Sequence, residues 1–467
     1  MQVLIVLKNI TYFAVLDTVV PLLAADGHHI LAFSDEERSQ GKTSWALDSC
    51  LENTPNLATG FTSRRADGWR RSLFAKREML SYSSYLHRGD QSEYYLKRWE
   101  KYLPSLVRSF VRRSKLARWL VGSSLTQVGL RAYERLVPPD KEIIRWLKQN
   151  RPDVVVASPM NMRFCEEVEY VKAAHALGIP TVVPVYSWDN LTTKGLYQVI
   201  PDVVLAWNQA QYKEATQIHQ VPPERVVITG APRFDEWFTV GRLGLEREVF
   251  CKQAGINSAR PYVLYLGSSA NIAQDETWLV HELASNLKAS PVPELAHMQV
   301  LVRPHPANVK IYEQLAMENV VVWPKGRTAI DTNEFLQGFY NSLQHCVATV
   351  GINTTGMIDA IINNRPGITI MTDYYQKTQM EAVHFRQLIK ADVLEVTRSI
   401  SECLSTIERI RQGGDLKQAD RQRFVLDYIR PRGLKRPAGE VVARAIELAG
   451  MGKSGTEINA ELEDKSI

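Results

Sequence analysis

Three short polar segments of the chain carry residue types that suit the binding of an anion. They are residues 267–271 (GSSAN), 303–306 (RPHP) and 351–356 (GINTTG). Each follows an apolar run that predicts a buried strand. The first is a small-residue loop whose backbone N–H groups can approach a ligand. The second supplies a guanidinium and an imidazole, and the third opens a helix, where unpaired N–H groups favour negative charge.

Single residues in and near these segments have more than one interpretation. Thr354 or Thr355 can cap the helix or bond a phosphate oxygen, and Asp359 lies where a ribose hydroxyl could reach it. An ordinary strand–helix turn is the alternative for residues 351–356 taken alone. For His305 the alternative is a capping or core histidine, and we favour a phosphate contact because Arg303 lies two residues before it.

The elements that position these segments alternate between strands and helices. Apolar runs predict one group of parallel strands at residues 2–7, 30–33, 153–158, 181–185, 202–207 and 226–230. A second group is predicted at residues 262–266, 299–302, 320–322, 347–350 and 368–371. This pattern predicts an α/β protein with two Rossmann-like domains facing a cleft. Loops at the carboxyl ends of the strands should converge on that cleft.

The domain boundaries follow from where the alternation is interrupted. We expect an N-terminal domain at residues 1–241 and a C-terminal domain at residues 242–424. Residues 425–450 are expected to form a helical segment that crosses back to the first domain. Residues 451–467 are expected to be disordered, because they are small and polar and lack an apolar face.

The first domain also contains a basic insertion at about residues 60–135, which predicts a set of added helices. From Arg64 to Arg118 there are 15 Lys/Arg and 5 Asp/Glu, whereas the whole chain has a net charge of +5. This local excess indicates an anionic partner. One interpretation is a basic amphipathic face on an anionic membrane surface, and the other is a helix packed on the sheet with solvated arginines. Nucleic acid is disfavoured because no recognised binding module accompanies the charge.

The overall composition is that of a globular protein with more than one core. Of the 467 residues, 45% are hydrophobic and 23% are charged, and no apolar run has the length of a membrane span. The five cysteines are dispersed without a CxxC pair, which predicts reduced, buried thiols and a cytoplasmic protein. The chain contains no D-x-D, P-loop, HExxH or GxSxG motif. We therefore expect a diphosphate site without a divalent metal ion or cofactor.

The motifs together resemble the GT-B glycosyltransferase fold. The resemblance rests on QVLIVLKNITYF at the start of the chain, LYLGSS, VRPHP and TVGINTTGMIDAIINNRPG, and it covers about residues 1–450. The C-terminal motifs are similar to those of bacterial cell-surface polysaccharide glycosyltransferases. They are also similar to those of CDP-glycerol glycerophosphotransferases and UDP-N-acetylglucosamine 2-epimerases.

This resemblance implies a nucleotide donor in the C-terminal domain and an acceptor in the N-terminal domain. The residues it implies at the donor diphosphate, with Asp359 near the ribose, are Gly267, Ser268, Ser269, Arg303, His305, Asn353, Thr354 and Thr355. His384 is a candidate to stack on or bond the base. The expected function is metal-independent transfer of a sugar from a nucleotide-diphosphate donor to a surface polysaccharide or lipid-linked glycan. The enzyme would work in the cytoplasm or at the inner face of the plasma membrane.

Several functions stay open beside this one. They are a CDP-glycerol-type polyol-phosphate transferase, a nucleotide-sugar 2-epimerase and a non-enzymatic sugar-nucleotide-binding protein at a membrane surface. The first loop also departs from the resemblance, because residues 8–11 (KNIT) contain no histidine to act as a base. We therefore predict Asp189, on a polar loop after a strand, as the general base, with Glu166 or Glu167 as second choices. Asp189 has a turn-forming role as its alternative, and a retaining enzyme would need no such base.

Overall fold

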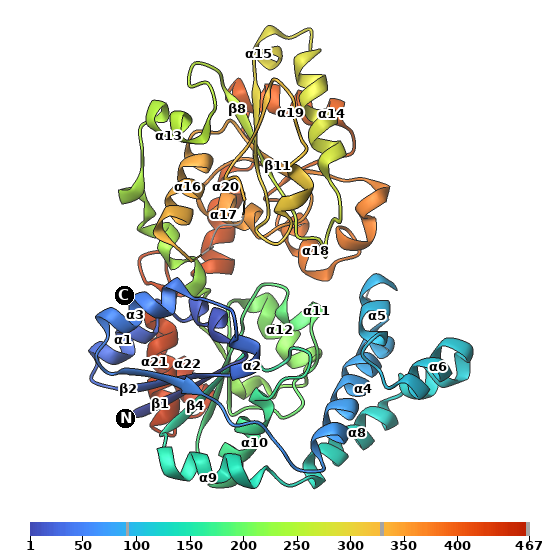
Figure 1. Cartoon of the computed structure of the whole chain (residues 1–467), viewed down its shortest axis with the longest axis vertical. Coiled ribbons are helices and arrows are strands. Elements are labelled where there is room, and N and C mark those ends of the chain that lie inside the picture. Colours follow the sequence, from blue (N-terminus) through green and yellow to red (C-terminus); the bar gives the residue numbers. More distant parts are fainter. Residues whose placement is uncertain (90–92, 327–330, 464–467) are drawn as a thin grey trace. The chain divides into compact units, whose positions relative to one another are not determined.

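The computed structural model describes residues 1–89, 93–326 and 331–463 (Figure 1). The chain divides into two compact units. Unit 1 comprises Met1–Asp235 and Leu426–Ile467, and unit 2 comprises Glu236–Val425. The boundary expected from the sequence, at residue 241, lies a few residues inside unit 2.

Unit 1 is built on a seven-stranded parallel sheet with the order β3-β2-β1-β4-β5-β6-β7. Its strands are β1 (Gln2–Leu7), β2 (His29–Ser34), β3 (Leu57–Phe61), β4 (Val154–Ser158), β5 (Thr181–Pro184), β6 (Val203–Ala206) and β7 (Val226–Ile228). The central strand β1 is apolar almost throughout because helices cover both faces of the sheet. On one face Val3 and Ile5 pack in a core with Val441. On the other face Leu4 packs with Leu147.

The helices of unit 1 follow the strands as a parallel sheet requires. Outside the insertion they are α1 (Val20–Ala25), α2 (Glu36–Ser39), α3 (Trp45–Asn53), α9 (Lys141–Asn150), α10 (Glu167–Leu177), α11 (Asn190–Thr193), α12 (Gln209–Gln217), α21 (Ala438–Gly450) and α22 (Gly455–Glu463). The C-terminal helix α21 packs against β4 and β5, so the end of the chain completes the core of unit 1.

In its described residues, 60–89 and 93–135, the basic insertion forms five helices, as its composition predicts. They are α4 (Arg70–Arg88), α5 (Glu93–Glu100), α6 (Ser105–Arg113), α7 (Lys115–Val121) and α8 (Ser124–Leu136). A buried ion-pair network joins helices α4 and α8 of the insertion to helix α10 of unit 1. Arg77 on α4 donates to Glu134 on α8 at 2.7 Å and to Glu169 on α10 at 2.5 Å. Arg65 is also buried, and it donates to Glu169. The interpretation of solvated arginines therefore does not apply to every arginine of the insertion.

Unit 2 is built on a six-stranded parallel sheet with the order β10-β9-β8-β11-β12-β13. Its strands are β8 (Tyr262–Leu266), β9 (Gln299–Arg303), β10 (Val320–Val322), β11 (Thr349–Gly351), β12 (Gly367–Ile370) and β13 (Glu395–Thr397). Its helices are α13 (Arg247–Ala254), α14 (Thr277–Lys288), α15 (Pro293–Ala296), α16 (Asn333–Gln344), α17 (Gly356–Ile362), α18 (Val383–Lys390), α19 (Ile400–Arg411) and α20 (Gln418–Phe424). Both sheets are parallel and flanked by helices, so the predicted two-domain α/β class is confirmed (Figure 1).

The expectation of a disordered tail is wrong for most of its length. Residues 455–463 form helix α22, which packs in unit 1. The physical reason is that this polar segment contains two apolar residues on one helix face. Ile458 and Leu462 lie one helical turn apart, and both are fully buried. Asn459 adds a hydrogen bond of 3.0 Å to the carbonyl of Val226 in β7. Residues 464–467 of the expected tail lie outside the described residues.

Within the described parts of the chain, no helix combines the length and apolar character needed to cross a bilayer.

Candidate functional site

The three anion-binding segments leave the sheet of unit 2 side by side. In the parallel register, Leu266 at the end of β8 pairs with Gly351 at the end of β11 and with Arg303 at the end of β9. The loops that follow these strands therefore start in one row at the carboxyl edge of the sheet. This edge is where ligands bind in open α/β folds.

The side chain of Arg303 is the most unusual feature of this edge. Its guanidinium is buried, and the rings of Trp323, Phe335 and Phe339 lie 5.4, 4.6 and 4.6 Å from it. Its Nη2 donates to the carbonyl of Phe335 at 3.2 Å, whereas its buried Nη1 has no hydrogen-bond partner among residues 1–89, 93–326 and 331–463. A buried donor of this kind is costly unless a ligand pairs with it.

Arg303 remains a cation despite this burial. Burial lowers its pKa from 12.5 to about 9, and the carboxylate of Asp359 opposes that effect. Asp359 lies in the first turn of α17, where it accepts a hydrogen bond of 2.8 Å from Nε1 of Trp237. The ring of Trp237 also packs against Phe339. Arg303, Asp359 and the aromatic side chains thus form one cluster at the start of α17.

His305 presents a hydrogen-bond donor beside this cluster. Its Nδ1 accepts from the N–H of Ala307 at 3.1 Å, and burial lowers its pKa, so the ring is neutral at neutral pH. In the neutral ring the proton then lies on Nε2. A Cβ added at Gly267 would meet Tyr312 Oη at 2.8 Å and the His305 N at 3.0 Å. Glycine therefore stands at position 267 because the neighbouring loop approaches it closely.

The role expected for Ser268 is wrong. Ser268 is fully buried, and both its N–H and its Oγ donate to the carboxyl group of Glu276. The same carboxyl group accepts from the hydroxyls of Tyr265 and Tyr312, at 3.0 and 2.9 Å. The two donors of Ser268 thus face an internal carboxyl group and are not available to a diphosphate. Ser269, the next residue, is half-buried and keeps its predicted role as a prediction.

The turn before α17 divides into a structural part and a part open to a ligand. Asn353 is buried and its amide donates to the carbonyl of Thr378 at 2.6 Å, so this amide anchors a neighbouring loop, and a contact of Asn353 with the diphosphate stays a prediction. Thr354 and Thr355 are half-buried, and Thr354 Oγ1 accepts a long, 3.4 Å hydrogen bond from the N–H of Gly356. The two threonines remain candidates for phosphate contacts.

The structure shows the surroundings of the candidate residues His384 and Asp189. His384 is buried near the start of α18. Stacking of its ring on a nucleotide base stays a prediction. Asp189 precedes α11 in unit 1, where its carboxylate accepts from Ser187 Oγ at 2.6 Å, Thr193 Oγ1 at 2.7 Å and Lys194 Nζ at 2.8 Å. A general base at this position would have to abstract a proton while holding these three donors.

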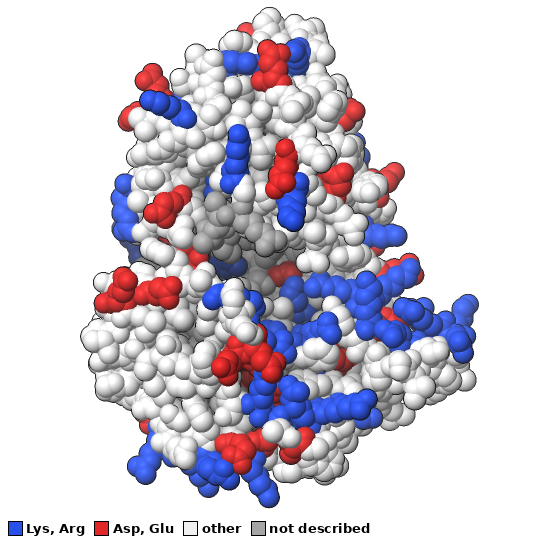
Figure 2. Space-filling view, viewed as in Figure 1, with Lys and Arg blue, Asp and Glu red and all other residues white. Residues whose placement is uncertain are grey.

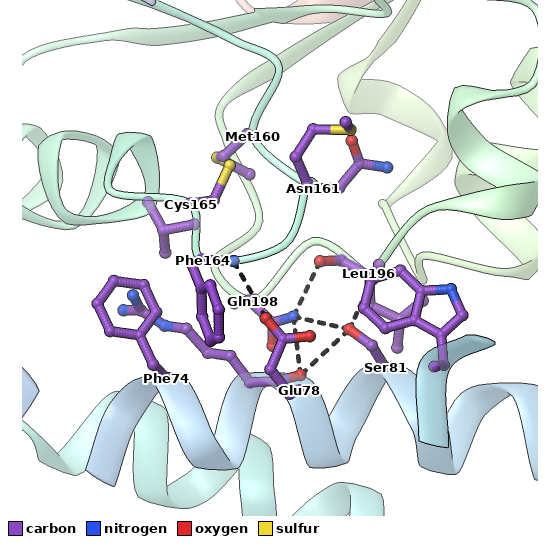
Figure 3. A pocket seen from close by; sticks show the side chains of 14 residues that line it. Phe74, Glu78, Ser81, Met160, Asn161, Phe164, Cys165, Leu196 and Gln198 are labelled. Atoms are coloured by element: carbon purple, nitrogen blue, oxygen red, sulfur yellow. Dashed lines mark hydrogen bonds between the residues drawn. The ribbon is translucent and has the colours of Figure 1, made fainter. Parts of the chain in front are cut away.

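Unit 1 contains a second carboxyl group that the sequence did not single out. Glu78 on α4 lines a small hollow of about 10 Å³, enough for about one water molecule, between α4 and the chain after β4 (Figure 3). Its Oε1 accepts from the N–H of Phe164 at 3.1 Å, and no described residue forms a hydrogen bond with its buried Oε2. Burial raises its pKa from 4.5 to about 7. This pKa is matched to proton transfer at neutral pH.

Glu166 and Glu167, the second-choice general bases, directly follow residues that line this hollow. Glu166 is paired with Arg70, and burial raises its pKa. Glu167 is fully buried, and burial also raises its pKa. No local sequence pattern distinguishes Glu78 from these two, because its environment is made by segments far apart in the chain.

Among the described residues, no cluster of three or more His, Cys, Asp or Glu side chains is arranged to hold a metal ion.

Comparisons with known proteins identify the fold. No family model matches the chain, and no curated protein matches its sequence. Among solved structures, a protein assigned as a UDP-N-acetylglucosamine 2-epimerase from Listeria monocytogenes has a TM-score of 0.55 at 9% identity, covering 97% of this chain and 98% of that one. The UDP-GlcNAc 2-epimerase from Methanocaldococcus jannaschii has a TM-score of 0.50 at 11% identity, with 95% and 98% covered.

A third similar structure is that of S. aureus MnaA with UDP. Its TM-score is 0.51 at 9% identity, and the match covers 96% of each chain. At such low identity these likenesses establish the fold and not the reaction. The chain therefore has the two-domain GT-B fold that these three structures share, as its sequence motifs indicate.

Proposed function

We propose that the chain is an enzyme that acts on a nucleotide-diphosphate sugar and transfers the sugar to a surface polysaccharide or lipid-linked glycan. The observation that carries this proposal is the buried, charged guanidinium of Arg303 at the carboxyl edge of the unit 2 sheet, whose Nη1 has no partner in the described part of the chain. A phosphate oxygen would supply the missing acceptor and would gain a charge-assisted hydrogen bond.

The same residues would act on the leaving group. When the bond to the sugar breaks, the nucleotide diphosphate gains negative charge. Arg303 Nη1 and the Nε2–H of His305 would stabilise that charge, because Arg303 is buried and the His305 ring is held by the N–H of Ala307. Thr354 and Thr355 would contact the other phosphate oxygens. Asp359 would neutralise part of the charge of Arg303 before the donor binds.

Unit 1 would provide the acceptor side. Asp189 is the predicted general base, and Glu78 is a competing choice because its raised pKa keeps a proton-accepting group poised near neutral pH. We place the enzyme in the cytoplasm, because all five cysteines are free and buried.

A nucleotide-sugar 2-epimerase is the second candidate. The two epimerase structures share the fold over almost the whole chain, and the similar MnaA structure is a complex with UDP. The same diphosphate site would serve an epimerase, which needs no acceptor. A polyol-phosphate transferase would also use this site, with attack at the phosphorus and not at the sugar carbon.

Donor screening followed by product analysis separates these functions. Thermal unfolding with UDP, GDP, CDP and CMP should show stabilisation by one nucleoside diphosphate and less by CMP. Preference for CMP would contradict the diphosphate site. Incubation of the matching nucleotide sugar, followed by NMR, then identifies the reaction. Epimerisation without an acceptor would establish the second candidate, and transfer only with a glycan acceptor would establish the first. Binding without any turnover would indicate a binding protein.

A further inference from the structure

The outer helices of the insertion expose an unusual number of large apolar side chains. Eight of the 21 exposed large apolar residues among the described parts of the chain lie between residues 105 and 136. They are Leu106 (84% exposed), Phe110 (60%), Leu116 (65%), Trp119 (68%), Leu120 (47%), Leu125 (84%), Val128 (64%) and Leu136 (82%). Such a concentration marks an interaction site, because single exposed apolar residues are normal whereas clusters are not.

The spacing of these residues places them on definite helix faces. Leu106 and Phe110 are four residues apart on α6, and Leu116, Trp119 and Leu120 share one face of α7. Leu125, Val128 and Leu136 recur at helical spacing along α8. The opposite faces of these helices pack against the rest of the protein, and Val111, Ala117 and Leu130 on them are buried. The exposed faces are thus not the core side of these helices.

Positive charge accompanies the apolar residues. Residues 105–133 contain six Lys or Arg and no Asp or Glu. Five of them, Arg108, Arg112, Arg113, Lys115 and Arg118, lie on α6 and α7, whereas Arg131 on α8 is half-buried and donates to the carbonyl of Tyr197. Figure 2 shows Lys and Arg side chains gathered on the side of unit 1 that carries α5 and α6. The acidic partners nearby are few, and Glu100 pairs with Arg112, which stays exposed.

We propose that this apolar–basic surface, made by the exposed side chains of α6 and α7 and the adjoining start of α8, binds an anionic lipid bilayer. The apolar side chains would insert at the boundary between headgroups and acyl chains, and the Lys and Arg side chains would contact anionic headgroups. A second copy of this chain fits less well, because it would bring two basic surfaces together. The protein would lie on the membrane through these helices.

Buried ion pairs hold helix α8 of the insertion against α4 and α10. Arg77 joins α4 to α8 and α10 through two buried carboxylates, and Lys172 adds a bond of 3.0 Å to Glu134. The exposed helices are therefore presented on a fixed part of unit 1. The proposal does not depend on the donor chemistry, since none of these residues belongs to the candidate site of unit 2.

Flotation of the full chain with lipid vesicles tests the proposal. The wild-type protein should float with vesicles of phosphatidylcholine and phosphatidylglycerol, and much less with phosphatidylcholine alone. The double variant Phe110→Ser/Trp119→Ser should bind at least about tenfold more weakly, because two exposed apolar side chains no longer insert. Arg113→Glu/Lys115→Glu should weaken binding at least about fivefold per site, and added salt should weaken wild-type binding.

Matched variants distinguish this surface from general stickiness. Phe61→Ser and Leu416→Ser remove apolar side chains that are 54% and 69% exposed elsewhere, and they should bind vesicles like the wild type. All variants should keep the wild-type unfolding temperature, because the changed side chains are exposed. Wild-type protein that does not float with anionic vesicles would overturn the proposal. So would a Phe110→Ser/Trp119→Ser variant that floats equally well, or one that instead abolishes a wild-type dimer seen by light scattering.

Discussion

Replacing Glu78 by Gln should change how the stability of unit 1 depends on pH. Burial raises the pKa of this carboxyl group from 4.5 in the unfolded chain to about 7 in the folded protein. Its protonated form is therefore favoured by folding, so the stability it contributes is complete below pH 4.5 and is lost as the pH rises through 7. The interval from 4.5 to 7 corresponds to about 3 kcal/mol.

Gln is a suitable replacement because it is neutral, has the same shape and keeps an oxygen to accept the N–H of Phe164. The free energy of unfolding should be measured by urea denaturation from about pH 5 to about pH 8 in both proteins. The wild type should lose up to about 3 kcal/mol more than Glu78→Gln over this range. The exposed Glu52→Gln on α3 serves as the control and should follow the wild type. If the wild type and Glu78→Gln lose stability in parallel, Glu78 is ionised in the folded protein and the reasoning is refuted.

Three further substitutions test packing and hydrogen bonds within unit 1 or within unit 2. Asp235→Asn should destabilise unit 1 by about 3–5 kcal/mol in urea unfolding, because the carboxylate accepts from Arg430 and from the N–H groups of Ala438 and Gly439. Leu462→Ala should cost about 2–5 kcal/mol in the same assay, whereas a disordered tail would make it neutral. Gly338→Ala would place a Cβ 2.5 Å from the Trp323 ring, so it should cost about 1–3 kcal/mol and weaken nucleotide binding measured by calorimetry.

The sequence predicts the strands of the two sheets well where they are central. Residues 2–7 and 262–266 are continuous apolar runs because parallel strands in a sheet covered on both faces are buried throughout. Two edge strands lack this signal, whereas the edge strands β7 and β10 carry apolar runs and are predicted. β3 (LATGF) and β13 (EVT) carry polar or exposed residues, and their pairing with a neighbouring strand, which no local pattern encodes, makes them strands.

The candidate site shows a similar division. The motif around Arg303 indicates an anion site because the residue types and their position after a strand are local features. The environment of the guanidinium is not local, since Trp323, Phe335 and Phe339 come from other elements. For the same reason the sequence missed Glu276, whose carboxyl group occupies the donors of Ser268.

The central claim is that Arg303 binds the diphosphate of a nucleotide donor. Calorimetry should compare the nucleoside diphosphate selected by donor screening with its nucleoside, in the wild type and in Arg303→Gln. The wild type should bind the diphosphate about 10- to 100-fold more tightly than the nucleoside, because a charge-assisted hydrogen bond contributes about 1.5–3 kcal/mol. Arg303→Gln should lose most of this preference, whereas Arg411→Gln, at an exposed site on α19, should keep it. An unchanged preference in a folded Arg303→Gln protein would contradict the account.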